Sequence, residues 1–245
     1  MPETPASTHT IIEVRNVSKA YVSRNYGPFG TKNIKPVLHT INLDIHSGEI
    51  FGLSGESGAG KSTLARCILG LLDYRGEIFI DGRLQQTGNS LTRHSGQVQA
   101  IFQEPGASLN PARSIGWLLE EPLHIHRRFL AAGTAAERTR LVDEMLVRLG
   151  LNPLYRRRRV HELSGGQKQR VCIGRALMLK PRILIADEAI SSLDVSAGAQ
   201  ILNLFSELRE TLGLTIFFIS HNMEAARYLC DRVAVMKDGV LLEGD

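Results

Sequence analysis

Two glycine-rich stretches and one acidic pair carry the residue types of this chain that could do chemistry. The first stretch, GESGAGKST at residues 55–63, has the spacing G-x-x-x-x-G-K-[ST] and follows an apolar segment, residues 49–54. Backbone N–H groups can surround phosphate oxygens only where side chains stay out of the way, and a lysine adds positive charge. The stretch therefore predicts a site for the phosphates of a nucleoside triphosphate.

The residues expected around the phosphates are Gly55, Glu56, Ser57, Gly58, Ala59, Gly60, Lys61, Ser62 and Thr63. Lys61 supplies the compact charge, and the hydroxyl of Ser62 is a ligand for Mg²⁺. A plain glycine-rich turn would not require the lysine and the hydroxyl at these positions.

The acidic pair Asp187 and Glu188 ends another apolar segment, residues 183–186. Ligands of parallel α/β sheets bind at the carboxyl ends of strands, so Asp187 is expected to reach the Mg²⁺. Glu188 points differently and is a candidate general base for the attacking water. Alone, the pair would also suit an exposed loop, but with the phosphate loop it indicates hydrolysis of a nucleotide. Gln103 and His221 close two further strand-like segments, and spacing alone assigns neither of them a role.

The second glycine-rich stretch is HELSGGQKQR at residues 161–170. Unlike the first, it has no lysine within its Ser-Gly-Gly-Gln segment, residues 164–167. Ser164 and Gln167 have the spacing of a capping box at the start of a helix. The stretch is either an ordinary capped helix or an anion-binding helix terminus that forms half of a shared site.

The chain resembles the ATP-binding cassette (ABC) ATPases over nearly its whole length, with the family's motifs in the family's order. The matching segments are Tyr21 for the aromatic residue at adenine, Gly55–Ser62 for Walker A, Gln103 for the Q-loop, Leu163–Gln167 for the signature, Ile183–Glu188 for Walker B, Ser191–Asp194 for the D-loop and His221 for the switch histidine. The departures are Ala186, Ala189 and Ser192, and none removes a catalytic group.

This resemblance implies an ATPase whose cofactors are ATP and Mg²⁺, with Gln103 and His221 raised to catalytic candidates beside Glu188. Ser62, Gln103 and Asp187 are the implied metal contacts. Two such domains pair head to tail in the family. By this resemblance Ser164, Gly165, Gly166 and Gln167 act on the ATP of a partner subunit.

Residues 101–123 resemble the peptide/nickel uptake subfamily, most tellingly in the string ASLNP at 107–111. This implies a peripheral subunit of an importer on the cytoplasmic face of the inner membrane, energising uptake of peptides, nickel or metal chelates. The implied partners are a second ABC ATPase, forming a heterodimer, two transmembrane permease subunits and, indirectly, an external binding protein, with no nucleic acid. The alternatives are a non-transport ABC ATPase of translation or DNA repair, and a small-molecule P-loop kinase.

The expected fold is α/β: a P-loop NTPase core with a mainly parallel sheet, an antiparallel β subdomain and an inserted helical subdomain. The chain has 245 residues, of which 43% are hydrophobic and 22% charged, enough to bury a full core. We expect a flexible tail at 1–10 and one ABC domain at 11–245. That domain is divided into a core with the β subdomain, 11–103 and 164–245, and a helical subdomain, 104–163.

Local signals add further structural expectations. Thr134 and Glu137 predict a capping box, and glycines at 70, 150 and 213 predict helix ends. The Gly- and Pro-rich residues 22–36 predict a long connection. Cys67, Cys172 and Cys230 have no metal-ligand spacing and predict free thiols in a reducing compartment. The run Arg156–Arg159 suits either anionic lipid or, preferably, a solvated face, and a net charge of +4 suits an anionic ligand or membrane without proving either.

Overall fold

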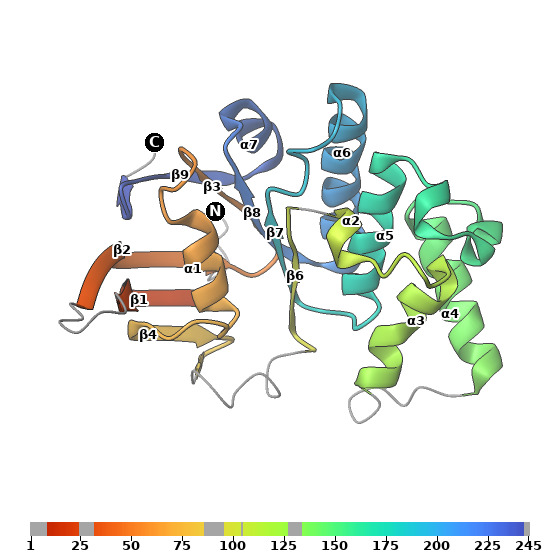
Figure 1. Ribbon diagram of the computed structural model, residues 1–245, viewed down its shortest axis with the longest axis horizontal. Coiled ribbons are helices and arrows are strands. Elements are labelled where there is room, and N and C mark those ends of the chain that lie inside the picture. The colour runs from red at the N-terminus through yellow and green to blue at the C-terminus, as the bar shows by residue number, and fades with distance from the viewer. Residues whose placement is uncertain (1–8, 25–31, 86–95, 104, 127–133, 243–245) are drawn as a thin grey trace, which may run out of the picture. The chain divides into compact units, whose positions relative to one another are not determined.

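The computed structural model describes residues 9–24, 32–85, 96–103, 105–126 and 134–242 (Figure 1). The chain forms two compact units, residues 1–93 with 217–245, and residues 94–216. Most of the predicted tail, residues 1–8, and the middle of the predicted connection, residues 25–31, lie outside the described residues.

The first unit contains an antiparallel sheet in the order β2-β1-β4-β5. Its strands are β1 (Thr10–Arg24), β2 (Lys32–His46), β4 (Arg75–Ile80) and β5 (Arg83–Leu84). The prediction of a connection over 22–36 was wrong at both ends, because β1 and β2 continue into it. Pro36 lies within β2, and its missing N–H is tolerated because β2 is at the edge of the sheet order.

The first unit also contains a second set of strands with two helices. These are β3 (Ile50–Ser54), β9 (Arg232–Lys237), β10 (Val240–Leu242), α1 (Lys61–Ile68) and α7 (Met223–Leu229). Strands β3 and β9 are parallel, whereas β9 and β10 form the predicted terminal hairpin. Its turn, Asp238-Gly239, has φ of 47° and 76°, the paired positive values that tight hairpins need.

The second unit contains a parallel strand pair and most of the helices. These are β6 (Val98–Ile101), β7 (Ile183–Asp187), α2 (Pro105–Ser108), α3 (Ile115–Ile125), α4 (Ala135–Arg148), α5 (Gly165–Leu177), α6 (Val195–Leu212) and the 3₁₀ helices η2 (Pro153–Arg157) and η3 (Val160–Glu162). Strand β8 (Thr215–Ser220) spans the boundary of the two units. All residues of β3, β7 and β8 are buried, as their continuous apolar sequences predict.

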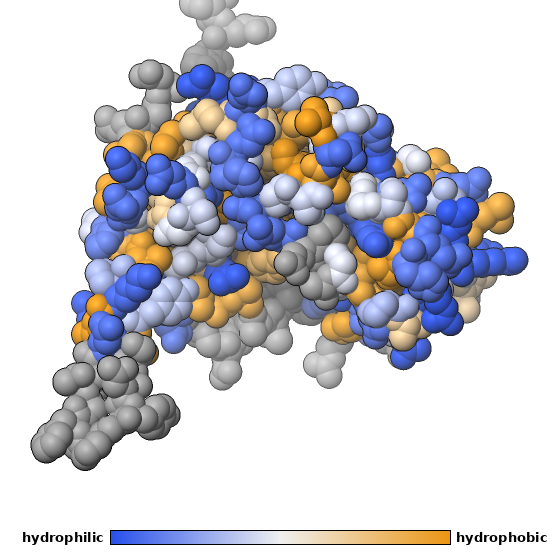
Figure 2. Space-filling model, turned by 45° about the horizontal axis from the view of Figure 1, so that its top comes forward, coloured by the Kyte–Doolittle hydropathy of each residue, from blue (hydrophilic) through white to orange (hydrophobic). Residues whose placement is uncertain are grey.

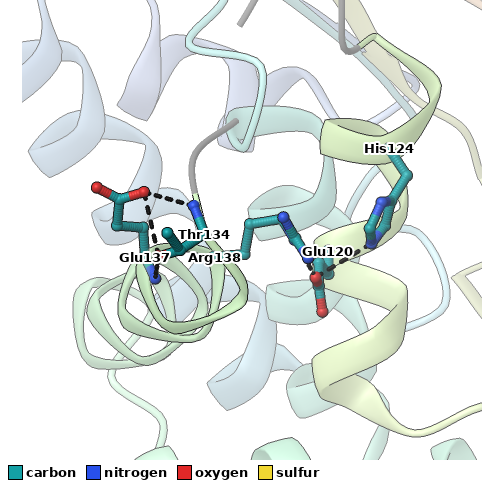
Figure 3. A network of polar contacts seen from close by, with 5 residues as sticks. All are labelled: Glu120, His124, Thr134, Glu137 and Arg138. Carbon is teal, nitrogen blue, oxygen red and sulfur yellow. Dashed lines mark hydrogen bonds and ion pairs between the residues drawn. The ribbon is translucent and has the colours of Figure 1, made fainter. Parts of the chain in front are cut away.

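The predicted helix boundaries are confirmed where local hydrogen bonds decide them. Gly70, Gly150 and Gly213 have φ of 70°, 67° and 62°, the left-handed conformation expected after a helix end. At the N-terminus of α4, Thr134 N–H donates to Glu137 Oε2 at 2.6 Å and Glu137 N–H donates to Thr134 Oγ1 at 3.3 Å (Figure 3).

A carboxylate of α3 joins the two helices that flank this cap. Glu120 Oε1 accepts from Arg138 Nε of α4 at 2.6 Å and lies 3.1 Å from His124 Nε2 of α3 (Figure 3). The pairs are partly exposed, so they orient α3 and α4 more than they stabilise them.

The three cysteines are free, as predicted. Burial raises the pKa of Cys67 to about 11 and those of Cys172 and Cys230 to about 12. A thiol with so high a pKa stays neutral near pH 7, and thiolate is the reactive form. The cysteines therefore behave as small apolar side chains.

Polar side chains cover much of the displayed face, with apolar residues interspersed among them (Figure 2). Within the described ranges, none of the helices combines the length and the hydropathy that crossing a bilayer demands.

Helix α5 crosses α3 and α4 at a glycine. A Cβ on Gly174 would lie 2.4 Å from Leu149 Cδ1 and 3.1 Å from Leu119 Cδ2. The first distance is shorter than real contacts, so a side chain at this position would have to displace the end of the Leu149 side chain. By contrast, a Cβ on Gly198 in α6 would have no atom within 4 Å.

Gly174→Ala and Gly198→Ala should therefore change stability in opposite directions. Overpacking should lower the free energy of unfolding of the Gly174 variant by about 1–3 kcal/mol. The Gly198 variant should gain roughly 0.5–1 kcal/mol, because alanine restricts the unfolded chain and no contact opposes it. Urea unfolding followed by circular dichroism measures both, and equal effects would contradict the crossing at Gly174.

Candidate functional site

The predicted phosphate loop connects β3 to α1 in the first unit and curls around its own lysine. Lys61 is 4% exposed, and its Nζ donates to the carbonyl oxygens of Gly55 at 2.7 Å and Glu56 at 2.8 Å. Gly60 is the N-cap of α1 in the left-handed conformation, and no side chain caps this helix. The helix terminus thus offers N–H donors to an anion, with an ammonium group held beneath the loop.

Two of the loop glycines are required by packing as well as by any ligand. A Cβ on Gly55, with φ of 147°, would lie 2.1 Å from the carbonyl oxygen of Met236 in β9. A Cβ on Gly60 would lie 3.0 Å from Leu38 Cδ2 of β2. Gly58 has φ of 84° and open space, so conformation alone demands glycine there. The space that phosphates need, which is the reason predicted from the sequence, is therefore only one of the reasons for these glycines.

The first unit also holds Tyr21 and His221. The Tyr21 side chain lies on β1 and is 39% exposed. His221 is exposed and directly follows β8, the neighbour of β3 in the sheet order. The Ser220 hydroxyl accepts from Asn222 N–H at 3.0 Å, and Asn222 Oδ1 accepts from Ala225 N–H at 3.1 Å. These bonds fix the backbone on both sides of the histidine.

The second unit brings Gln103 and the acidic pair to one edge of its parallel strands. Ile101 of β6 pairs with Ala186 of β7, so Gln103 and Asp187 both lie just beyond that point in the same direction. Asp187 is the last residue of β7 and is 4% exposed. An amide oxygen and a carboxylate oxygen at one strand edge are the kinds of ligand that Mg²⁺ takes.

Glu188 adopts a backbone conformation that is rare for its residue type. Its φ is 51°, the left-handed region that costs a non-glycine residue on the order of 1 kcal/mol. Ser191 stabilises this conformation, because its N–H and its hydroxyl both donate to the Glu188 carbonyl oxygen, at 3.1 Å and 2.9 Å. The contact of Ser191, the first serine of the string SSLD, was not predicted from the sequence.

The signature segment forms the predicted capping box at the start of α5. Ser164 N–H donates to Gln167 Oε1 at 3.1 Å, and Gln167 N–H donates to Ser164 Oγ at 3.3 Å. A Cβ on Gly165 would lie 3.5 Å from Leu193 Cδ2, and one on Gly166 would lie 3.3 Å from Ala197 Cβ. The second unit therefore brings the signature glycines against the segment that follows Glu188.

Three arginines of the run Arg156–Arg159 have partners within the second unit. Arg156 Nη1 lies 3.0 Å from Asp143 Oδ2, Arg158 stacks on the Tyr155 ring at 3.8 Å, and Arg159 donates to the Ala112 carbonyl oxygen. Arg156 and Arg159 thus join segments that are far apart in the sequence, an arrangement that neither the lipid nor the solvated-face interpretation foresaw.

Replacing Ser191 by alanine should lower kcat of the predicted ATPase about fivefold, because one hydrogen bond on the Glu188 carbonyl is worth roughly 1 kcal/mol. KM should stay unchanged, since no substrate contact is removed. Ser191→Thr, which keeps the hydroxyl, should restore most of the rate in a phosphate-release assay. Ser196→Ala, an exposed serine in α6, is the matched control, and an equal loss there would contradict the role of Ser191.

Comparisons with known proteins agree with this arrangement of motifs. A family model described as ABC transporter matches residues 38–191. An oligopeptide transport ATP-binding protein of Bacillus subtilis, AppF, is 40% identical over 98% of this chain and 73% of its own length. A glutathione import ATP-binding protein of Pectobacterium atrosepticum, GsiA, is 41% identical over 98% of this chain and 38% of its own length.

A solved structure gives the same result for the fold. A dimeric ATP-binding cassette in a post-hydrolysis state, bound to ADP and Pi, superimposes with a TM-score of 0.81 at 31% identity. The match covers 96% of this chain and 97% of that one. The predicted α/β fold is confirmed, and the chain belongs to the ABC transporter family as an ATP-binding and ATP-hydrolysing member.

Proposed function

We propose that this chain is the ATP-hydrolysing subunit of an importer that takes up peptides or metal chelates such as nickel complexes across the cytoplasmic membrane. The observation that carries the proposal is the signature segment, a helix terminus without a lysine that is capped by Ser164 and lies in the unit that also holds Glu188. Relatives named for oligopeptide and glutathione import support a peptide-like cargo. Nickel rests on the subfamily likeness of residues 101–123 alone.

The phosphate loop is proposed to hold the triphosphate through its backbone N–H groups and Lys61. The Lys61 ammonium donates to the carbonyl oxygens of Gly55 and Glu56, and a neutral carbonyl is a weaker hydrogen-bond partner than a phosphate. Binding would therefore replace these bonds by stronger charge-assisted ones without moving the lysine far. Tyr21, with its partly exposed ring, is proposed to stack on adenine.

Ser62, Gln103 and Asp187 are proposed to hold Mg²⁺, which would neutralise charge on the phosphates. Their hydroxyl, amide and carboxylate oxygens fit the preference of this ion. The buried carboxylate of Asp187, at the end of a wholly buried strand, is the kind of charge that a protein retains for a cation.

Glu188 is proposed to accept the proton of the attacking water, and its left-handed backbone distinguishes it from Asp187, the last residue of β7. Gln103 and His221 are proposed to contact the water and the γ-phosphate. Each is exposed at the end of a strand, where a ligand can reach it.

The signature residues Ser164, Gly165, Gly166 and Gln167 are proposed to act on the ATP of a second ABC ATPase. Gln167 Oε1 already accepts from Ser164 N–H, so the segment enters such a contact with its backbone geometry set. The proposed partners are that second ATPase in a heterodimer, two permease subunits and, indirectly, an external binding protein. We place the subunit at the cytoplasmic face of the membrane and the permease contacts on a helical subdomain, 104–163, of the domain 11–245. A role in translation or DNA repair is not favoured, since the relatives are named for import.

Glu188→Gln should bind ATP normally yet hydrolyse it at least about 100-fold more slowly, because the amide cannot accept the proton. The side chains are of similar size, so folding should be unaffected. Equilibrium binding and phosphate release, measured on the same preparation, test this. Near-normal turnover would show that another group is the base.

Ser164→Arg should leave ATP binding by the isolated subunit unchanged and lower hydrolysis by the assembled transporter at least about tenfold. The bulky cation replaces the cap and obstructs the face offered to the partner's phosphates. His161→Arg, with the same side chain three residues earlier, is the control. Full activity of the Ser164 variant in the assembled complex would refute the action in trans.

A further inference from the structure

The ammonium group of Lys19 lies over one face of the Tyr21 ring, within the first unit. Its Nζ is 5.4 Å from the ring centroid, a distance at which a cation and an aromatic ring attract each other. Strand β1 changes register between Lys19 and Ala20, an irregularity that bends a strand and redirects its side chains. Within the described ranges, no carboxylate pairs with Lys19.

The same lysine lies beside the start of α1. Lys19 pairs across the sheet with Leu38, and Leu38 Cδ2 is the atom that a Cβ on Gly60 would meet at 3.0 Å. The charge of Lys19 also lowers the pKa of Cys67 in α1, against the larger effect of burial. Lys19 thus lies over the aromatic ring, and its cross-strand partner Leu38 lies against the start of α1.

We propose that Lys19 is a positioning residue for the base of ATP, covering one face of the Tyr21 ring so that adenine stacks on the other. This inference rests on the proposed function of the site. A ring already held by the lysine loses less rotational freedom when a base stacks on it, so more of the stacking energy appears as affinity.

Two observations favour action on the base over direct action on the phosphates. Nζ lies over the ring, where its charge is already engaged, and the phosphate loop has its own ammonium in Lys61. Lys35 lies directly opposite Tyr21 on β2 and is exposed, and among the described residues it is the ammonium of Lys19, not that of Lys35, that lies over the ring. It provides an equal charge at a similar place that lacks the geometry of Lys19.

The test compares Mg-ATP with inorganic tripolyphosphate, which has the phosphates and no base. Calorimetric titration of the full chain measures the dissociation constant of each. Lys19→Met, which keeps the apolar stem, should weaken ATP binding about two- to fivefold, the range of a cation–π contact at a partly exposed site. Tripolyphosphate should bind to this variant as tightly as to the wild type. Lys19→Arg, which keeps a cation at this position, should bind ATP with wild-type affinity.

A double-mutant cycle and a charge control complete the design. In a Tyr21→Ala background Lys19→Met should have no further effect, because the lysine acts through the ring. Lys35→Met should leave the dissociation constants of both ATP and tripolyphosphate unchanged. Equal weakening of ATP and tripolyphosphate, an undiminished effect without the ring, or a matching loss in Lys35→Met would each overturn the inference.

The failure of this inference is distinguishable from that of the proposed function. If Mg-ATP binds and Lys61→Ala abolishes binding, while Lys19→Met changes nothing, only the role of Lys19 is wrong. If the wild-type chain binds no Mg-ATP, the proposed nucleotide site fails and this inference fails with it.

Discussion

The conformation of the phosphate loop depends on a backbone approach that leaves no room for a side chain. At Gly55 the end of β3 passes so close to the Met236 carbonyl of β9 that a Cβ would lie 2.1 Å from it. This contact fixes where the loop leaves the sheet, and Gly60, confined by Leu38, fixes where it enters α1. Between these points the loop closes around Lys61. The shape of the predicted phosphate loop therefore depends on how β2, β3 and β9 pack.

In the second unit, hydrogen bonds of side chains hold unusual backbone conformations that glycine holds in the first unit. Glu188 stays in a left-handed conformation because two groups of Ser191 bond to its carbonyl oxygen. The signature helix begins at a reciprocal cap between Ser164 and Gln167. Leu193 and Ala197 lie against the two signature glycines. The catalytic candidate and the signature segment consequently share one short, hydrogen-bonded stretch of chain.

Much of this was predictable from sequence, because the deciding interactions are local. The caps at Thr134 and Ser164, the glycine helix ends and the buried strands all follow from spacings of a few residues, as does the phosphate loop. The connection predicted at 22–36 was wrong, because pairing between β1 and β2 overrides the turn signals of Gly and Pro. The contact of Ser191 was not predicted, because the left-handed conformation of Glu188 that it stabilises leaves no pattern in the sequence. The position of Lys19 over the Tyr21 ring, 5.4 Å from its centroid, was not predicted for the same reason.

The tight crossing at Gly174 has a mechanical consequence for the helices of the second unit. Helix α5 has 13 residues and so spans about 20 Å, with the signature segment at one end and Gly174 near the other. Leu119 and Leu149 lie against α5 at Gly174, so a shift of α5 relative to α3 and α4 would have to repack these side chains. A displacement of α3 and α4 is therefore expected to move α5 with them, and with it Ser164 at the N-terminus of α5.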